Sequence, residues 1–116
     1  MAESAEVAVR RVGDAGVLQA PGYINSEGGE KVAEVCDSLV DDGVRKLVLN
    51  LENCSIVNSV GISFLIEVLE KITDLGGKLA FCCVGTTTAK TLQIMGLRQK
   101  ASLHDTEEQA LAELAG

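Results

Sequence analysis

The chain has 116 residues, 47% hydrophobic and 23% charged, a composition typical of a globular protein and a length too short for two domains. Its 10 Lys and Arg against 17 Asp and Glu give a net charge of −7, which argues against direct binding to nucleic acid. It contains no apolar run long enough to span a membrane and no secretory signal at its start. We therefore expect residues 1–116 to form a single cytoplasmic domain without membrane insertion.

The first predicted feature is an antiparallel hairpin. Apolar residues alternate with polar or small residues over 7–11, and a second extended run covers 17–20. Turn-forming residues at Gly13, Asp14 and Gly16 lie between the two runs. A Pro-Gly pair then ends the second strand, because proline cannot donate a hydrogen bond to a central ladder.

A first helix is predicted next. Asn25 or Ser26 can cap its start, because a short polar side chain accepts a hydrogen bond from the first turn. Gly28 and Gly29 weaken that turn, which predicts that this end is either mobile or closely approached by another group. The predicted buried face recurs with helical spacing at Val32, Val35, Cys36, Leu39 and Val40.

The centre of the chain predicts a buried strand over 47–51 and a long amphipathic helix over 59–75. Val60 and Phe64 break the helical pattern, since they project onto the exposed side near the helix start. This apolar pair either forms a regulated docking surface or is covered by the preceding loop. The predicted buried face comprises Ile62, Leu65, Ile66, Leu69 and Ile72, and the predicted exposed face comprises Glu67, Glu70, Lys71 and Asp74.

Strands and helices continue to alternate towards the C-terminus. This order predicts an α/β fold, with the N-terminal hairpin followed by a mostly parallel sheet of four to five strands and about four helices. The C-terminal elements are a strand over 78–84, a short helix from one of the threonines at 86–88 to Met95, a strand over 101–104, and a helix over 107–115 capped by Asp105.

Ser59 lies where an apolar strand has ended and a helical period begins, so its hydroxyl should sit at or beside the helix N-cap. Unpaired N–H groups and the positive end of the helix dipole would stabilise a phosphate there. Serine is also a common N-cap residue. On spacing alone, a cap without further function is therefore the simpler interpretation.

The cysteines predict neither a metal site nor an enzyme. Cys36, Cys54, Cys82 and Cys83 show no Cys-x-x-Cys spacing, and His104 is the only histidine. Adjacent strand residues point to opposite faces, so we expect Cys82 and Cys83 not to act as a thiol pair. Activating a thiolate requires a basic neighbour, and the histidine lies in a different segment. We therefore expect no cofactor and no catalytic residue.

Residues 57–62, Val-Asn-Ser-Val-Gly-Ile after a buried strand, resemble the signature of the STAS-domain family of anti-sigma factor antagonists. That signature has six positions. In order, they are a hydrophobic residue, Asp, Ser, a residue that is either Ser or Thr, Gly, and a second hydrophobic residue. The resemblance extends over essentially the whole chain. It includes Pro21 to Ile24, Gly76 to Leu79, and Met95 to Leu97.

The resemblance implies a partner switch. The unphosphorylated antagonist would bind an anti-sigma factor that is also a serine kinase, and so free a sigma factor. The kinase would phosphorylate the antagonist with ATP, and a phosphatase would reset it. Ser59 matches the family's phosphoacceptor. Apart from the Val60 and Phe64 pair, no predicted helix shows a second apolar stripe, so we expect the free antagonist to be a monomer. The expected partner-binding residues are Asn25, Asn58, Ser59, Val60, Gly61, Ser63 and Phe64.

The chain departs from the family at three asparagines. The family usually has Asp directly before the phosphoacceptor, where this chain has Asn58, and often has Asp at the positions of Asn25 and Asn50. Asn58 keeps the shape of the aspartate side chain but loses its charge. The first alternative to a phosphorylation-controlled antagonist is a STAS scaffold or transport accessory that binds partners without phosphorylation. The second alternative is an enzyme that uses a cysteine.

Overall fold

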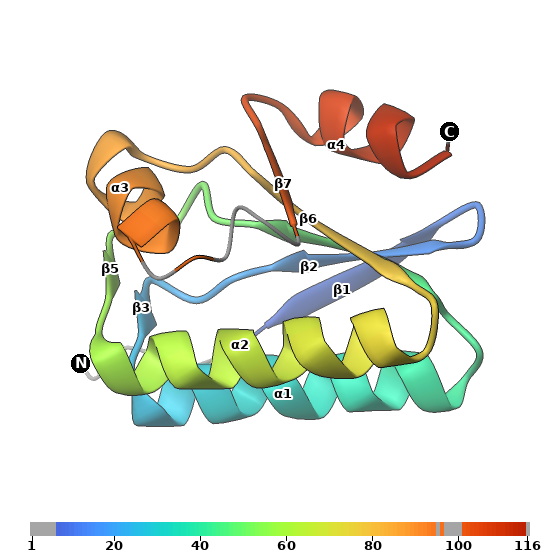
Figure 1. Cartoon of the computed structure of the whole chain (residues 1–116), viewed down its shortest axis with the longest axis horizontal. Helices are drawn as coiled ribbons and strands as arrows, with labels where there is room; N and C mark the ends of the chain where they lie inside the picture. The colour runs from blue at the N-terminus through green and yellow to red at the C-terminus, as the bar shows by residue number, and fades with distance from the viewer. Residues whose placement is uncertain (1–6, 95, 97–100, 116) are drawn as a thin grey trace.

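The structure, a computed structural model, describes residues 7–94, 96 and 101–115. β1 is antiparallel to its neighbour and the other three pairings are parallel, which confirms the predicted hairpin and mostly parallel sheet (Figure 1). The five strands lie in the order β1 (Ala8–Val12), β2 (Ala15–Gln19), β4 (Lys46–Asn50), β6 (Lys78–Cys82) and β7 (Ser102–His104).

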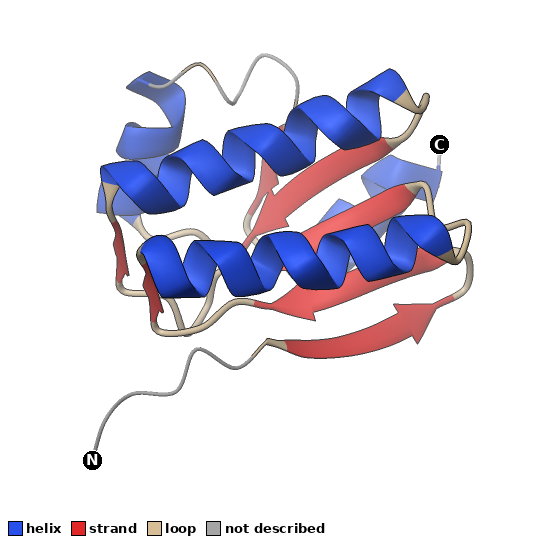
Figure 2. Cartoon of the chain, turned by 90° about the horizontal axis from the view of Figure 1, so that it is seen from below, coloured by secondary structure: helices blue, strands red, loops and turns tan. Residues whose placement is uncertain are grey.

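Four described helices cover the sheet unevenly. α1 (Ser26–Asp41) and α2 (Ser59–Asp74) lie side by side on one face of the sheet (Figure 2). α4 (Glu107–Ala115) packs on the opposite face, against β6, β4 and β7. α3 (Thr86–Ile94) follows the end of β6, and its predicted last residue, Met95, lies outside the described residues. The α/β fold class is confirmed.

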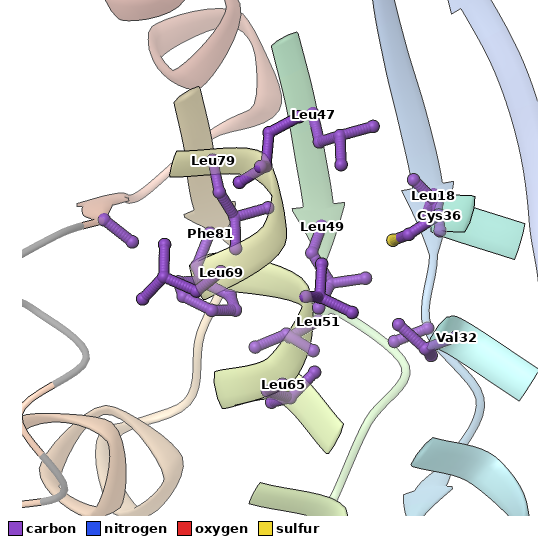
Figure 3. Packing of buried hydrophobic residues seen from close by; sticks show 14 of the residues in the cluster. Leu18, Val32, Cys36, Leu47, Leu49, Leu51, Leu65, Leu69, Leu79 and Phe81 are labelled. Carbon is purple, nitrogen blue, oxygen red and sulfur yellow. The ribbon is translucent and has the colours of Figure 1, made fainter. Parts of the chain in front are cut away.

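Alternation along the central strands creates two cores. In β4, Leu47 and Leu49 face α1 and α2, whereas Val48 faces α4. The core under α1 and α2 is the larger, and Figure 3 shows Leu49, Leu65 and other fully buried side chains meeting there. The core under α4 is made largely of small residues: Val17, Val48, Ala80, Cys82, Ala110 and Leu114.

A second, two-stranded sheet was not predicted. β3 (Tyr23–Ile24) and β5 (Ile56–Val57) pair in parallel, and each precedes one of the long helices. Two residues are too few to show a strand period, so the sequence carried no signal for this pairing. It matters for function because it holds the starts of α1 and α2 next to each other.

The buried face of α2 differs from the prediction at two positions. Ile66 is only half-buried, whereas Val68 is buried. α2 packs against both the sheet and α1, so its buried stripe is wider than the single face assumed from its period. The other predicted core residues of α2 are buried, and the four predicted charged positions are exposed.

Two local predictions were wrong. Gly16 belongs to β2 rather than to the hairpin turn, and a Cβ there would lie 2.9 Å from Leu39 Cδ1 of α1. Gly16 therefore makes room for helix packing. At the start of α4 the Thr106 Oγ1, and not Asp105, accepts the Gln109 N–H at 3.1 Å. The Asp105 N–H donates instead to Gln109 Oε1.

Candidate functional site: the start of helix α2

Asn58 caps α2. Its backbone is extended, with φ −92° and ψ 177°, and its Oδ1 accepts the Gly61 N–H at 2.8 Å. Its carbonyl accepts the Ile62 N–H at 2.9 Å. Ser59 is therefore the first helical residue, directly beside the cap as predicted.

Ser59 is free of any capping role. Its side chain is exposed, and within the described residues its hydroxyl forms no hydrogen bond. The first turn of α2 carries no acidic residue, so within this helix the positive end of the dipole favours negative charge at the hydroxyl. The site can accept a phosphate without removing a contact that the helix needs.

Exposed apolar side chains flank Ser59. Val60 is 46% exposed, Ile56 of β5 is 53% exposed and Tyr23 of β3 is 39% exposed. Asn58 Nδ2 lies 3.5 Å from the Tyr23 hydroxyl, at the limit of a hydrogen bond. We call Tyr23, Ile56, Asn58, Ser59 and Val60 the Ser59 surface.

Tyr23 and Ile56 were missed by sequence reasoning. They are paired residues of the small β3–β5 sheet, which carried no strand signal. The sequence did contain one clue. Tyr23 and Ile56 each stand two positions before an Asn-Ser dipeptide.

Phe64 contradicts part of the prediction. It is half-buried rather than exposed, because it packs on Gly29 of α1. A Cβ at Gly29 would lie 2.7 Å from Phe64 Cδ2, so the glycine provides the space for the ring. Of the predicted apolar pair, only Val60 is exposed. Ser63 is exposed, and its hydroxyl donates to the Val60 carbonyl at 2.6 Å.

The start of α1 repeats the geometry of the start of α2. Asn25 caps α1, and its Oδ1 accepts the Gly28 N–H at 2.9 Å. Residues 23–28, Tyr-Ile-Asn-Ser-Glu-Gly, correspond one by one to residues 56–61, Ile-Val-Asn-Ser-Val-Gly. Tyr23 pairs with Ile56 and Ile24 with Val57, and Ser26 and Ser59 each follow this pairing as the first residue of their helices.

The two glycines of this repeat meet backbone atoms. A Cβ at Gly61 would lie 1.9 Å from the Ile24 carbonyl oxygen, and one at Gly28 would lie 2.3 Å from the Tyr23 carbonyl oxygen. The predicted close approach at Gly28 is thus confirmed. Gly61 has no room for a side chain, so it positions the surface without itself forming a contact area.

Asn50 lies away from the Ser59 surface. It is 5% exposed on the α4 face, and its Nδ2 donates to Glu107 Oε1 at 3.2 Å. Its Oδ1 accepts the Glu52 N–H at 2.8 Å. Arg10 forms an ion pair with the same Glu107. An aspartate at position 50 would face a second carboxylate here, which gives a physical reason for the asparagine.

Burial raises the pKa of the Cys36, Cys54 and Cys82 thiols, so these three remain protonated at neutral pH. Burial raises the pKa of Cys36 to about 12. The pKa of Cys82 is also raised to about 12, mainly by burial and further by the neighbouring Cys83. Cys82 does pair in register with His104, contrary to the expected separation. Cys83 has a left-handed φ of 59° and packs with Cys82 in the α4 core, so the prediction of opposite faces was wrong.

Within the described part of the chain, no cluster of three or more His, Cys, Asp or Glu side chains could hold a metal ion. None of the described helices is long and apolar enough to cross a membrane.

Residues 6–110 match the STAS domain family, and the chain belongs to this family. Among its curated relatives is the anti-sigma F factor antagonist of Paenibacillus polymyxa, which is 31% identical over 68 residues, or 59% of this chain and 58% of the relative. The recognised resemblance is confirmed.

Solved structures share the fold. A Thermotoga maritima protein described as an anti-sigma factor antagonist superimposes with a TM-score of 0.85 at 21% identity, covering 95% of each chain. The antagonist SpoIIAA matches in its unphosphorylated form, with a TM-score of 0.77 at 18% identity and 96% and 99% of the two chains covered. The phosphorylated Bacillus form matches with a TM-score of 0.74 at 18% identity, covering 93% and 98%.

Proposed function

We propose that this protein is an anti-sigma factor antagonist controlled by phosphorylation of Ser59. In the unphosphorylated state it binds an anti-sigma factor that is also a serine kinase, and thereby releases a sigma factor. The kinase transfers the γ-phosphoryl group of ATP to the Ser59 hydroxyl, and a phosphatase removes it. The observation that carries the proposal is an exposed serine, relieved of capping by Asn58, in the middle of an exposed apolar surface.

Phosphorylation would oppose binding through desolvation. A phosphate adds about −1.5 to −2 charges, and bringing it into a dry contact with Val60, Ile56 and Tyr23 costs several kcal/mol. A cost of about 4 kcal/mol is a thousandfold loss of affinity. No refolding is required, since Ser59 makes no side-chain hydrogen bond within the described residues. The similarity of the chain to both forms of SpoIIAA supports a switch within one fold.

The asparagine before the phosphoacceptor is compatible with this switch. Asn58 Oδ1 already makes the capping hydrogen bond that an aspartate would make. The missing charge removes repulsion between a side-chain carboxylate and the phosphate. Asn58 therefore preserves the geometry, and we expect Asn58→Asp to leave the capping bond intact.

The test is an intact-mass and binding assay with the cognate kinase and ATP, comparing wild type, Ser59→Ala and Ser59→Asp. Ser26→Ala is the matched control, because Ser26 has the same position at the neighbouring helix start. We expect one phosphate on wild type and Ser26→Ala and none on Ser59→Ala. Ser59→Ala should bind the kinase tightly and Ser59→Asp should not.

Label that persists on Ser59→Ala, at Ser26, Ser55 or Ser63, would refute the assignment. Absence of phosphate with equal binding by all variants would instead identify a constitutive STAS binding module, such as a scaffold or transport accessory. Sedimentation of the free protein would check the expected monomer.

A further inference from the structure

Cys82 and Cys83 are adjacent thiols at the end of β6, and their side chains lie on the same face of the sheet. Regular strand geometry would point them to opposite faces. Cys83 instead has a φ of 59°, and among the residues that the structure describes it is the one non-glycine residue with a positive φ. This conformation is uncommon for a residue that carries a Cβ. It directs the Cys83 side chain to the α4 core, where it packs with Cys82.

The two thiols interact with each other. Burial is the largest cause of the raised pKa of Cys82, and the next causes are the charge of Cys83 and a side-chain hydrogen bond with Cys83. Cys82 is fully buried and Cys83 is half-buried, so a small molecule reaches the pair from the Cys83 side. The Cys83 N–H donates to the His104 carbonyl at 3.1 Å, which anchors this end of β6 to β7. The two residues therefore form a vicinal dithiol with one accessible member.

A direct disulfide between these two residues would be strained. None of the described peptide bonds is cis. Adjacent Cα atoms lie about 3.8 Å apart across a trans peptide, whereas disulfides usually span about 4.4–6.8 Å between Cα atoms. A disulfide outside the usual span is strained and easily reduced. A bridging atom between the two sulfurs enlarges the ring by one member and relieves this constraint. The pair therefore suits a ligand that bridges the sulfurs.

The surroundings of the pair restrict which ligand can bridge it. Within the part of the chain that the structure describes, no third His, Cys, Asp or Glu joins these thiols to form a metal-binding cluster. Structural zinc takes four protein ligands, so two thiols alone do not make a zinc site. Thiol sulfur is a soft ligand and selects soft partner atoms. A trivalent arsenic atom that already carries one organic group needs only two sulfurs, and its pyramidal geometry holds them at a narrow angle.

We propose that Cys82 and Cys83 together bind a monosubstituted trivalent arsenical. With phenylarsine oxide, the arsenic–oxygen double bond is replaced by two arsenic–sulfur bonds, both thiol protons move to the oxygen, and one water leaves. Arsenic stays trivalent, so the step needs no oxidant or reductant. The bound group lies at the α4 core, on the face of the sheet opposite α1 and α2 (Figure 1). This binding does not rest on the proposed phosphorylation switch.

The experiment adds phenylarsine oxide to the folded full chain and measures intact mass in the presence of excess glutathione. We expect one phenylarsenic group on each chain with loss of two hydrogens, because a monothiol competes poorly with two linked thiols. Dithiothreitol, a dithiol, should remove the group. Cys83→Gly should bind at least about a hundredfold more weakly, because one sulfur is lost. Glycine adopts a positive φ without strain, so this variant should be at least as resistant to urea as wild type.

Cys36→Ala and Cys54→Ala are the matched controls, because each removes a thiol outside the pair. Both should bind the arsenical as wild type does. Equal binding by wild type and Cys83→Gly would show that another thiol is the site and would overturn the proposal. Uptake only after unfolding in urea would show that the folded chain keeps the two sulfurs apart. A native chain that takes up the arsenical only after reduction would show that the pair closes as a disulfide instead.

Discussion

Among the described glycines, Gly61 has the least room for a side chain. A Cβ there would lie 1.9 Å from the Ile24 carbonyl oxygen, and backbone yields less readily than a side chain. We expect Gly61→Ala to lower the free energy of unfolding by about 3 kcal/mol in urea titrations. Gly85→Ala, where a Cβ meets open space, should change it by less than about 0.5 kcal/mol. Equal losses in both variants would contradict the contact.

Cys36 makes stability depend on alkaline pH. Burial raises its pKa from 9.0 to about 12, so between these values the thiol ionises in the unfolded chain and stays protonated in the folded one. Folding is then weakened as pH rises, by up to about 1.4 kcal/mol per pH unit. Between pH 9 and 11, Cys36→Ala should make the free energy of unfolding fall less steeply with pH. The expected difference in slope corresponds to about one proton, or about 1.4 kcal/mol per pH unit. An unchanged slope would show that this thiol is accessible to water.

The attachment of α4 depends on a buried amide. Asn50 donates to Glu107, so Asn50→Asp replaces a hydrogen bond with two facing carboxylates. We expect the free energy of unfolding to fall by about 2 kcal/mol at pH 7 and amide hydrogen exchange in α4 to become faster. Adding Glu107→Gln to Asn50→Asp restores a donor opposite the carboxylate and should recover most of the loss. If the single variant is as stable as wild type, the amide does not hold α4.

The helices and central strands followed from sequence because their patterns are long. Sixteen residues of α2 display several turns of period, and the alternation of β4 and β6 with helices predicted the parallel sheet. β3 and β5 have two residues each, so neither could show alternation, and with them Tyr23 and Ile56 were lost from the predicted site. Phe64 failed for a related reason, since Gly29, a residue of another helix, provides its burial.

Modification of Ser59 should leave the molecule as a whole unchanged. The hydroxyl is exposed, the cap belongs to Asn58, and the positive helix end tolerates added negative charge. We expect Ser59→Asp and the phosphorylated protein to unfold cooperatively within about 2 °C of wild type in thermal scans, a change of a few tenths of a kcal/mol. A broadened transition would show that the switch acts by loosening the fold rather than by blocking contact.

The paired helix starts provide a comparison of two serines inside one molecule. Ser26 and Ser59 follow identical caps and precede equivalent glycines, so an enzyme that recognised only local backbone shape would modify both at similar rates. Any preference of the kinase for one serine must therefore come from the flanking side chains. The clearest difference between the two sites is that Glu27 follows Ser26 whereas Val60 follows Ser59. The ratio of the two rates therefore measures how much of the kinase's selectivity resides in the side chains that flank each serine.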